Sequence, residues 1–418
     1  MQICFGEDDD SMYRFIENVN AERHDAFVQS HPLCNLLQSS SWAKVKDNWG
    51  HAFIGVEDED VLVASSLVLI KQLPFGLTML YLPRGPVLDF NNKELVGFFM
   101  KNLKQFAKKR HAVYVTMDPA VHCNDYLLSE VNENRYEQSA AIVSLLESQG
   151  ALFKGYTKDI DATVQPRYHA NVYAQEDLRA SFSKSARKGL SIAEKKHVRI
   201  EECGVEAAEQ FARVMHCTEE RKGIALRDLK YFKKLMQAYP QDSVICLAKL
   251  PLKKLYEESI QKLTQNEEAL KQCPPNAKKK RFTLEEQHSS FTREVKELKE
   301  NVEKNGDEVI IAGGLCVKFG PSAELLYAGM DERYKRYMPS YAAFCACMEW
   351  SFAHGCTSCN MGGVEGTLDG GLMKFKSNFN PTINEFIGEF DFPVHSLLYR
   401  CAMAAYHYRK KQMAKHHK

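Results

Sequence analysis

The sequence predicts a mixed α/β (α+β) protein built from two similar units, with an antiparallel helical hairpin inserted into the second unit. Two observations predict the units: in both halves of the chain, short runs rich in β-branched residues alternate with segments of helical periodicity. A third observation predicts the hairpin, because residues 249–304 are dense in Lys, Glu and Gln and poor in β-branched residues. At 418 residues, the chain is long enough for two or three domains.

The first unit carries three strand signals and two helix signals. Its longer helix is predicted from apolar residues at spacings of four, four and three: Leu95, Phe99, Leu103 and Phe106. The shorter helix ends at Gly150, a residue suited to a helix C-terminus. The expected strands are 61–71, 78–82 and 112–117, and the expected helices are 92–109 and 140–148.

The second unit repeats this alternation, which suggests a duplicated fold, although no residue-by-residue repeat is visible. One of its helices carries a buried stripe at helical spacing: Tyr341, Cys345, Met348 and Phe352. The expected strands are 243–248, 308–319 and 323–328, and two further helices are expected over 175–195 and 205–221.

The inserted hairpin is predicted from a thin, partly polar heptad seam. Its second half carries Leu284, His288, Phe291, Val295, Leu298 and Val302 at alternating spacings of four and three. Its first half repeats Tyr256, Leu263 and Leu270, with Leu252, Ser259 and Asn266 between them. Cys273-Pro274-Pro275 breaks the pattern midway, so the two helices should fold back on each other as an arm.

Composition excludes several classes of protein. The chain has 55 Lys and Arg against 54 Asp and Glu, so a nucleic-acid or membrane partner must be held by local patches. Thirteen cysteines are too sparse for a disulfide scaffold, and the opening residues lack a secretory signal, so a reducing cytoplasm is expected. The longest apolar stretch, 61–70, is shorter than the roughly 20 residues that span a bilayer.

Three basic patches stand out, at 184–199, 278–281 and 409–411. A run of charge is usually a solvated helix face, and the alternative is a surface for phosphates of a nucleic acid or an anionic lipid. The candidate phosphate-binding residues are Lys184, Arg187, Lys188, Lys278, Lys279, Lys280 and Arg281.

Other motifs exclude common chemistries. The Gly-rich loop expected around 362–371 matches neither a dinucleotide fingerprint nor a P-loop, and no GxSxG nucleophile elbow or acetyl-CoA pyrophosphate loop is present. Cys356 and Cys359 form a lone CxxC, for which buried packing is favoured over zinc, and no metal site is expected. In Tyr81–Pro86, two prolines flank Arg84-Gly85, which indicates either a rigid turn with a solvated Arg84 or a stiff loop that shapes a pocket floor.

Eight segments along the chain together carry a resemblance to one family. They are QSSSWAKVK (38–46), YLPRGPVLDF (81–90), VTMDP (115–119), VQPRYHA (164–170), ERKGIALRDLKYF (220–232), LLYAGMDERYKRY (325–337), NMGGVEG (360–366) and GGLMKFKSNFNPTINEFIGEF (370–390). These segments resemble the Fem/Mur (FemABX) family of aminoacyl-tRNA-dependent transferases, which form peptidoglycan bridges. Among its members, the chain most resembles the MurM-type enzymes, which add serine or alanine.

This resemblance implies two acetyltransferase-like (GNAT) domains, 1–155 completed by 388–418, and 156–387, with the arm at 249–306 inserted in the second. It implies transfer of serine or alanine from aminoacyl-tRNA to the side-chain amine of the third stem-peptide residue, commonly lysine. The acceptor would be a lipid-linked or UDP-linked muropeptide, met at the inner face of the plasma membrane. No cofactor, CoA or metal is implied.

The resemblance also implies roles for single residues. Lys376 matches a catalytic-site lysine suited to stabilise an oxyanion, with Phe375 beside it, and Asp118 matches an acid that accepts a proton or orients the amine. Lys46 and Arg227 match positions that hold the acceptor's diphosphate. Tyr231, Tyr327 and Arg84 complete the expected substrate-binding set, and the basic patches at Lys184–Lys188 and Lys278–Arg281 are candidates for tRNA.

Two other functions remain open at this stage. One is an acyl-CoA-dependent N-acyltransferase of the same fold, against which the missing pyrophosphate loop counts. The other is a non-enzymatic RNA-binding scaffold, which the arm and the basic patches would suit.

Overall fold

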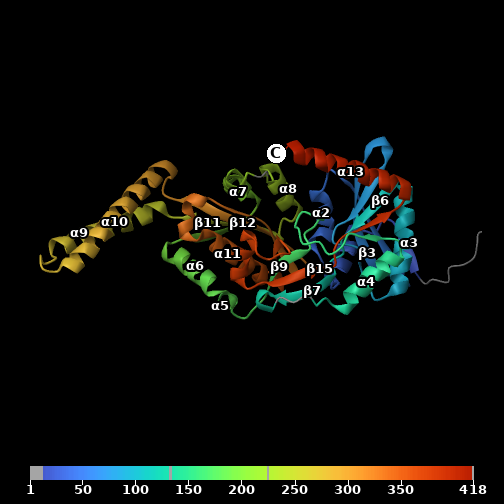
Figure 1. Ribbon diagram of the computed structural model, residues 1–418, viewed down its shortest axis with the longest axis horizontal. Coiled ribbons are helices and arrows are strands. Elements are labelled where there is room, and N and C mark those ends of the chain that lie inside the picture. Colours follow the sequence, from blue (N-terminus) through green and yellow to red (C-terminus); the bar gives the residue numbers. More distant parts are fainter. Residues whose placement is uncertain (1–12, 131–133, 224–225, 417–418) are drawn as a thin grey trace, which may run out of the picture. The chain divides into compact units, whose positions relative to one another are not determined.

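The computed structural model describes residues 13–130, 134–223 and 226–416 of the chain (Figure 1). The contacts divide the chain into two compact units. Unit 1 comprises residues 1–181, 317–324 and 351–418, and unit 2 comprises residues 182–316 and 325–350. Each unit is described by itself, and the domain boundaries expected from the sequence stay a prediction.

Unit 1 contains a sheet of order β1-β2-β3-β4-β6-β16-β8, in which β5 pairs with β3. Most neighbours are antiparallel, but β4 and β6 run parallel. The late strand β16 lies between β6 and β8, so that Phe390 is opposite both Met117 and Phe153. The strands are β1 (Tyr13–Ile16), β2 (Gly50–Asp58), β3 (Val61–Gln72), β4 (Thr78–Leu82), β5 (Val87–Leu88), β6 (Ala112–Met117), β8 (Leu152–Phe153) and β16 (Phe390–Pro393).

Helix α3 covers this sheet with the apolar stripe that the sequence predicts. Leu95, Phe99, Leu103 and Phe106 are all buried, and the Asn92 side chain caps the helix by accepting a hydrogen bond from Leu95 N at 3.0 Å. The other helices of unit 1 are α1 (Ala21–Ser30), α2 (Ser40–Val45), α4 (Glu137–Ser148), α5 (Leu178–Ser181), α12 (Gly371–Lys376) and α13 (Ser396–His416), beside α3 (Lys93–Lys109). Short 3-10 turns lie at Leu36–Gln38, Pro74–Gly76, Leu128–Glu130 and Ser377–Phe379.

A second group of strands in unit 1 positions the candidate site. Residues 322–324 of β13 pair in parallel with β14, and β14, β9, β15 and β7 follow as antiparallel neighbours. Their bounds are β7 (His122–Leu127), β9 (Tyr168–Tyr173), β13 (Ser322–Met330), β14 (Ser358–Val364) and β15 (Thr382–Phe386).

Unit 2 contains β10, β11 and β12, which are neighbours in this order, and the rest of β13. The predicted single helix over 175–195 is wrong. The chain forms α5 and then a separate helix, α6 (Lys184–Lys195), which Ser183 caps by accepting a hydrogen bond from Ala186 N. The elements are β10 (Arg199–Cys203), β11 (Ser243–Leu250), β12 (Val309–Phe319), α6 (Lys184–Lys195), α7 (Ala208–Lys222), α8 (Leu229–Ala238) and α11 (Pro339–Ala353), with 3-10 turns at Val205–Ala207 and Glu332–Tyr337.

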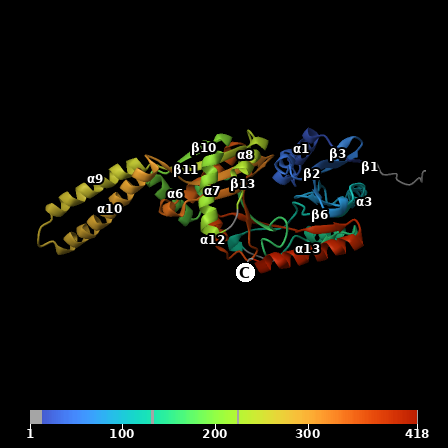
Figure 2. The ribbon, with the colours of Figure 1, turned by 90° about the horizontal axis from the view of Figure 1, so that it is seen from above.

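The inserted arm is confirmed as two long helices that lie side by side, α9 (Leu252–Lys271) and α10 (Lys278–Asn305) (Figures 1 and 2). The polar seam positions Ser259 and Asn266 are buried, and Asn266 Nδ2 donates to Leu284 O at 3.2 Å. The base of the arm belongs to the core of unit 2, because Leu252, Leu255 and Leu298 share a cluster with Tyr334 and Tyr337. The mixed α/β class and the inserted hairpin are thus as predicted.

Among the residues that the structure describes, no helix is both long and apolar enough to cross a bilayer.

Candidate active site

A tight turn after β4 is the first component of the site. Arg84 adopts a left-handed backbone with φ of 54°, and the Gly85-Pro86 peptide is cis. A Cβ atom on Gly85 would lie 2.5 Å from Gln38 Nε2, so glycine is required where Gln38 approaches the turn. Gln38 Nε2 donates to Pro83 O at 2.6 Å. Gln38 therefore supports the turn. The interpretation of this segment as a turn with a solvated Arg84 is wrong, because the Arg84 side chain is buried.

Asp118 anchors the same turn from the end of β6. Its Oδ1 accepts a hydrogen bond from Arg84 N at 2.6 Å, and its Oδ2 accepts one from Tyr81 Oη at 2.9 Å. Burial raises the pKa of Asp118 to about 7, and the nearby Arg84 charge opposes that shift only in part. Both carboxylate oxygens are thus occupied by the loop that Asp118 supports, while its expected role in proton transfer stays a prediction.

The Arg84 side chain is buried and turns inward. Its Nη2 donates to Pro166 O at 2.7 Å and lies 3.0 Å from His169 Nε2, and its Cζ lies 3.9 Å from the centre of the Phe386 ring. Burial and the charges of Arg84 and Lys376 lower the pKa of His169 well below its usual value. His169 is therefore a neutral imidazole beside a fixed guanidinium.

Lys376 lies at the end of α12 with its ammonium buried. Its Nζ donates to Gly362 O and to Gly363 O, both at 3.0 Å. These carbonyls belong to a bulge in β14, where the register with β9 shifts between Asn360 and Gly363. Gly362 has φ of 85°, so the bulge requires glycine there. The expectation of a Gly-rich loop beginning at Gly362 is therefore wrong, because Gly362 and Gly363 lie within a strand.

Asn360 joins the two halves of this site. Its Nδ2 lies 2.8 Å from His169 Nδ1, and its Oδ1 accepts a hydrogen bond from Gly362 N at 2.8 Å. A continuous chain of contacts thus runs from Asp118 through Arg84, His169, Asn360 and the bulge to Lys376. We call this chain the Asp118–Lys376 network. Phe375, which precedes the lysine, is half-buried and packs edge-on against Phe379 at 5.5 Å.

The sequence did not single out His169 or Asn360. Both lie in segments that carry the family resemblance, yet neither residue type nor spacing marks them. Their contact depends on the register of β14 with β9, in which Asn360 is opposite Asn171, two residues from His169. A single sequence contains no direct signal for that register.

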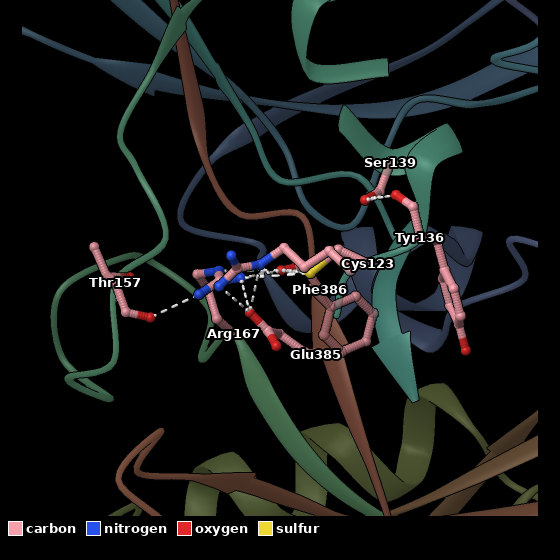
Figure 3. A network of polar contacts seen from close by, with 8 residues as sticks. Cys123, Tyr136, Ser139, Thr157, Arg167, Glu385 and Phe386 are labelled. Carbon is pink, nitrogen blue, oxygen red and sulfur yellow. Dashed lines mark hydrogen bonds and ion pairs between the residues drawn. The ribbon is translucent and has the colours of Figure 1, made fainter. Parts of the chain in front are cut away.

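A second buried network supports the strand next to the site (Figure 3). Arg167 Nη2 donates to Glu385 Oε1 at 2.7 Å and to Phe386 O at 2.8 Å, while its Nη1 donates to Thr157 O at 2.9 Å. Because Phe386 also lies against the Arg84 guanidinium, the Arg167 contacts fix one wall of the Asp118–Lys376 network. No local pattern in the sequence indicates this network.

Lys46 also lies in unit 1, directly after α2. Its ammonium lies 5.1 Å from the centre of the Trp42 ring, and the side chain is half-buried. Lys44, two residues earlier, is exposed. The two lysines therefore have different surroundings despite their proximity in sequence.

Three predicted residues come together in unit 2. Tyr327 Oη donates to Tyr231 Oη at 3.2 Å, and Arg227 Cζ lies 5.0 Å from the centre of the Tyr231 ring. Asp228 caps α8 by accepting from Tyr231 N at 2.9 Å. Burial raises the pKa of Tyr231, and Tyr327 adds to that shift. Arg227 itself is exposed, so this cluster presents a cation beside two phenols.

The candidate tRNA-binding residues occupy exposed faces of unit 2. Lys184, Arg187 and Lys188 are exposed on α6, whereas Ala186, Gly189 and Leu190 of the same helix are buried. Lys278, Lys279 and Lys280 are exposed at the tip of the arm, and Arg281 pairs with Glu285 at 3.2 Å. The side chains of residues 409–411 lie outside the described part of the structure.

Cys356 and Cys359 are both buried, as expected for packing residues. Among the described residues, no group of three or more His, Cys, Asp or Glu side chains could hold a metal ion.

Asp118→Asn should change how stability depends on pH. Folded Asp118 takes up a proton near pH 7, whereas the unfolded chain does so near 3.8. The native state therefore binds more protons in this window, and its stability falls as pH rises from about 4 to 7, by about 1.4 kcal/mol per pH unit for one group. Urea unfolding at pH 5, 6 and 7 should show Asp118→Asn becoming more stable relative to wild type as pH rises.

The matched control for this measurement is Glu147→Gln, which alters an exposed carboxylate on α4. Its stability should follow that of the wild type at each pH. A constant difference between Asp118→Asn and wild type across the series would contradict the buried, high-pKa carboxyl.

The sequence and the structure are both similar to those of known proteins. The model of the FemAB family matches residues 19–407 of the chain. Lipid II:glycine glycyltransferase of Staphylococcus saprophyticus subsp. saprophyticus is 27% identical over 402 residues, covering 92% of this chain and 94% of that protein. The enzyme of the same name from Staphylococcus aureus is 26% identical over 411 residues, again covering 92% and 94%.

Among solved structures, that of FemX aligns with a TM-score of 0.74 and 24% identity, covering 93% of this chain and 99% of the FemX chain. This likeness confirms the fold class expected from the sequence. A tandem GNAT protein from the clavulanic acid biosynthesis pathway aligns more weakly, with a TM-score of 0.49 and 8% identity. The relatives named for glycine weigh against the expected MurM-type preference for serine or alanine.

Proposed function

The chain belongs to the FemAB family and is an aminoacyltransferase of peptidoglycan bridge formation, and we propose that its donor is an aminoacyl-tRNA and its acceptor a lipid-linked muropeptide. The amino acid would pass to the side-chain amine of the third stem-peptide residue. The observation that carries this proposal is the Asp118–Lys376 network, in which a buried ammonium joins a rigid loop through neutral polar groups.

Aminolysis of an ester requires no protein nucleophile. The ammonium first loses one proton to solvent, and the resulting amine attacks the carbonyl carbon to form an oxyanion. The oxyanion then collapses, the bond to the ribose oxygen breaks, and a second proton from the amine goes to that oxygen, which leaves as a hydroxyl. A lysine ammonium in a site shielded from water is suited to stabilise that oxyanion. The absence of a nucleophile motif from the sequence agrees with this chemistry, and the proposed reaction needs no CoA or metal.

The identity of the amino acid rests on two indications that differ. The resemblance of sequence segments favours serine or alanine, whereas the relatives that match over nine-tenths of the chain are named for glycine. We propose a small amino acid, with glycine first. Competition among glycyl-, alanyl- and seryl-tRNA in one reaction, read by mass spectrometry of the product, decides between them.

The donor is tested by supplying purified protein with charged tRNA and lipid-linked precursor. Product should form with charged tRNA and should be lost when the donor pool is treated with RNase. Free amino acid with ATP should not substitute. Product that survives RNase, or that forms with acyl-CoA instead, would overturn this proposal in favour of an acyl-CoA-dependent enzyme. Binding of RNA without any transfer would favour a scaffold.

The family resemblance supports Lys46 and Arg227 as candidates for contact with the acceptor's diphosphate, and each is tested by itself. A phosphate contact is present in the ground state and the transition state alike, so its loss should raise KM for the acceptor while kcat changes little. Lys46→Ala and Arg227→Ala should each raise that KM by about 10-fold, as expected for one charge-assisted hydrogen bond.

Lys44→Ala is the matched control for Lys46→Ala, because Lys44 is an exposed lysine of α2, two residues before Lys46. Its KM should equal that of the wild type. Equal effects at Lys44 and Lys46, or a fall in kcat at saturating acceptor, would refute the proposed diphosphate contact.

A lipid-linked acceptor would also bring the enzyme to the inner face of the membrane, which vesicle co-sedimentation with and without the precursor would detect.

A further inference from the structure

A row of polar side chains crosses strands β13, β14 and β9 of unit 1 beside the Asp118–Lys376 network. Glu324 of β13 is opposite Asn360 of β14, and Asn360 is opposite Asn171 of β9. Register partners project from the same face of a sheet. Glu324, Asn360 and Asn171 therefore lie on one face, and the contact of Asn360 with His169 attaches this row to the network.

The two ends of this row have unused hydrogen-bonding capacity. Within the described residues, the half-buried carboxyl of Glu324 makes no hydrogen bond or ion pair. Asn171 Oδ1 is shielded from solvent and accepts no hydrogen bond from any described group. An unpaired buried acceptor is costly and rare in folded proteins, so Asn171 Oδ1, in one row with a carboxyl that also makes no hydrogen bond, indicates that a donor is missing.

The electrostatic surroundings of Glu324 disfavour its charged form, which a bound cation would stabilise. Burial raises the pKa of Glu324 to about 7, and the charge of Arg84 opposes that shift only in part. Arg84 Nη2 is directed at Pro166 O and His169 Nε2, and no hydrogen bond joins Arg84 to Glu324 among the described residues. Asp118 differs from Glu324, because both of its oxygens are occupied.

We propose that Glu324, with Asn360 and Asn171 beside it, binds the primary ammonium group of a substrate. An ammonium has three donors and no acceptor, which complements a carboxylate flanked by amide oxygens. The Glu324 carboxylate would accept a hydrogen bond from the ammonium, and Asn171 Oδ1 would accept another when the group is bound. This inference rests on the proposed function for the source of the ammonium, because both substrates of that reaction carry one.

The two sources are the α-ammonium of the aminoacyl donor and the side-chain ammonium of the acceptor. They are separated with two pairs of small probes that require no turnover. The donor pair is 3′-glycylamino-3′-deoxyadenosine and its N-acetyl derivative. The acceptor pair is Nα-acetyl-lysine amide and its Nε-acetyl derivative. Calorimetric titration of the full-length protein gives the affinity for each probe.

Wild type should bind the free amine of one pair about 10-fold or more tightly than the blocked form, as expected for one charge-assisted hydrogen bond. Glu324→Gln should abolish that preference, and Glu147→Gln, an exposed carboxylate in the same unit, should retain it. Preference in the donor pair assigns the site to the aminoacyl group, and preference in the acceptor pair assigns it to the muropeptide. Thermal melting establishes that both variants are folded.

Two outcomes would overturn the proposed site: no preference in either pair with wild type, or an undiminished preference in Glu324→Gln. The transfer assay is read separately. Wild-type protein that shows a Glu324-dependent preference but transfers nothing from charged tRNA would leave the ammonium site standing and would refute the proposed function. Wild-type protein that transfers an amino acid from charged tRNA but shows no such preference would refute the ammonium site and would leave the proposed function standing.

Discussion

Lys376→Ala is expected to lower turnover of the transferase by about 100- to 1,000-fold, the usual cost of removing one donor that stabilises an oxyanion. The Nζ of Lys376 is buried and is held by two carbonyls of the β14 bulge, so its position is fixed before substrate arrives. A fixed ammonium acts in the transition state without reorganising, and kcat and kcat/KM should therefore fall together. Steady-state rates with saturating charged tRNA and precursor give the measurement.

Lys374→Ala is the matched control, because Lys374 is an exposed lysine on the same short helix. Its kinetics should be those of wild type. Lys376→Ala also leaves the carbonyls of Gly362 and Gly363 without their ammonium partner, so its melting temperature must be measured beside its rate. A folded Lys376→Ala protein with near wild-type turnover would refute the proposed role.

The sequence predicted the fold best where side-chain periodicity was strong. The predicted strands 78–82 and 112–117 agree with β4 and β6, and the predicted helix 92–109 agrees with α3 and its Asn92 cap. Each element buries an apolar face, and such faces leave a clear pattern. The break between α5 and α6 was missed because it depends on the Ser183 cap within a mostly polar segment.

The candidate site was predictable only in part. Lys376, Asp118 and Arg84 were reached through segments that resemble a family, and the structure joins them in one network. His169, Asn360 and Glu324 were missed because each contributes through strand register, which brings together residues far apart in sequence. The row Glu324–Asn360–Asn171 joins three strands and has no local signature.

Loss of the buried Arg167–Glu385 pair is expected to be the most destabilising single change considered for unit 1. Both side chains are buried, and Arg167 also holds the carbonyls of Thr157 and Phe386. Burial alone would raise the pKa of Glu385, but the hydrogen bond and charge of Arg167 hold it below its usual value. Arg167→Met leaves this charge with Arg135 alone, at 3.2 Å and in a more exposed position.

Removing one partner of a buried ion pair typically costs about 3–5 kcal/mol, because the other charge remains buried. Arg167→Met should lower the urea midpoint accordingly, and Arg167→Met with Glu385→Gln should recover part of that loss, since no uncompensated buried charge remains and the Arg135 side chain is partly exposed. The exposed pair Arg213–Glu209 is the control, and Arg213→Ala should cost at most about 0.5 kcal/mol. If the double variant were no more stable than Arg167→Met, the lost contacts to Thr157 and Phe386, rather than the orphaned carboxylate, would account for the destabilisation. In that case Phe386, which packs under Arg84, should also shift, and turnover should fall with stability.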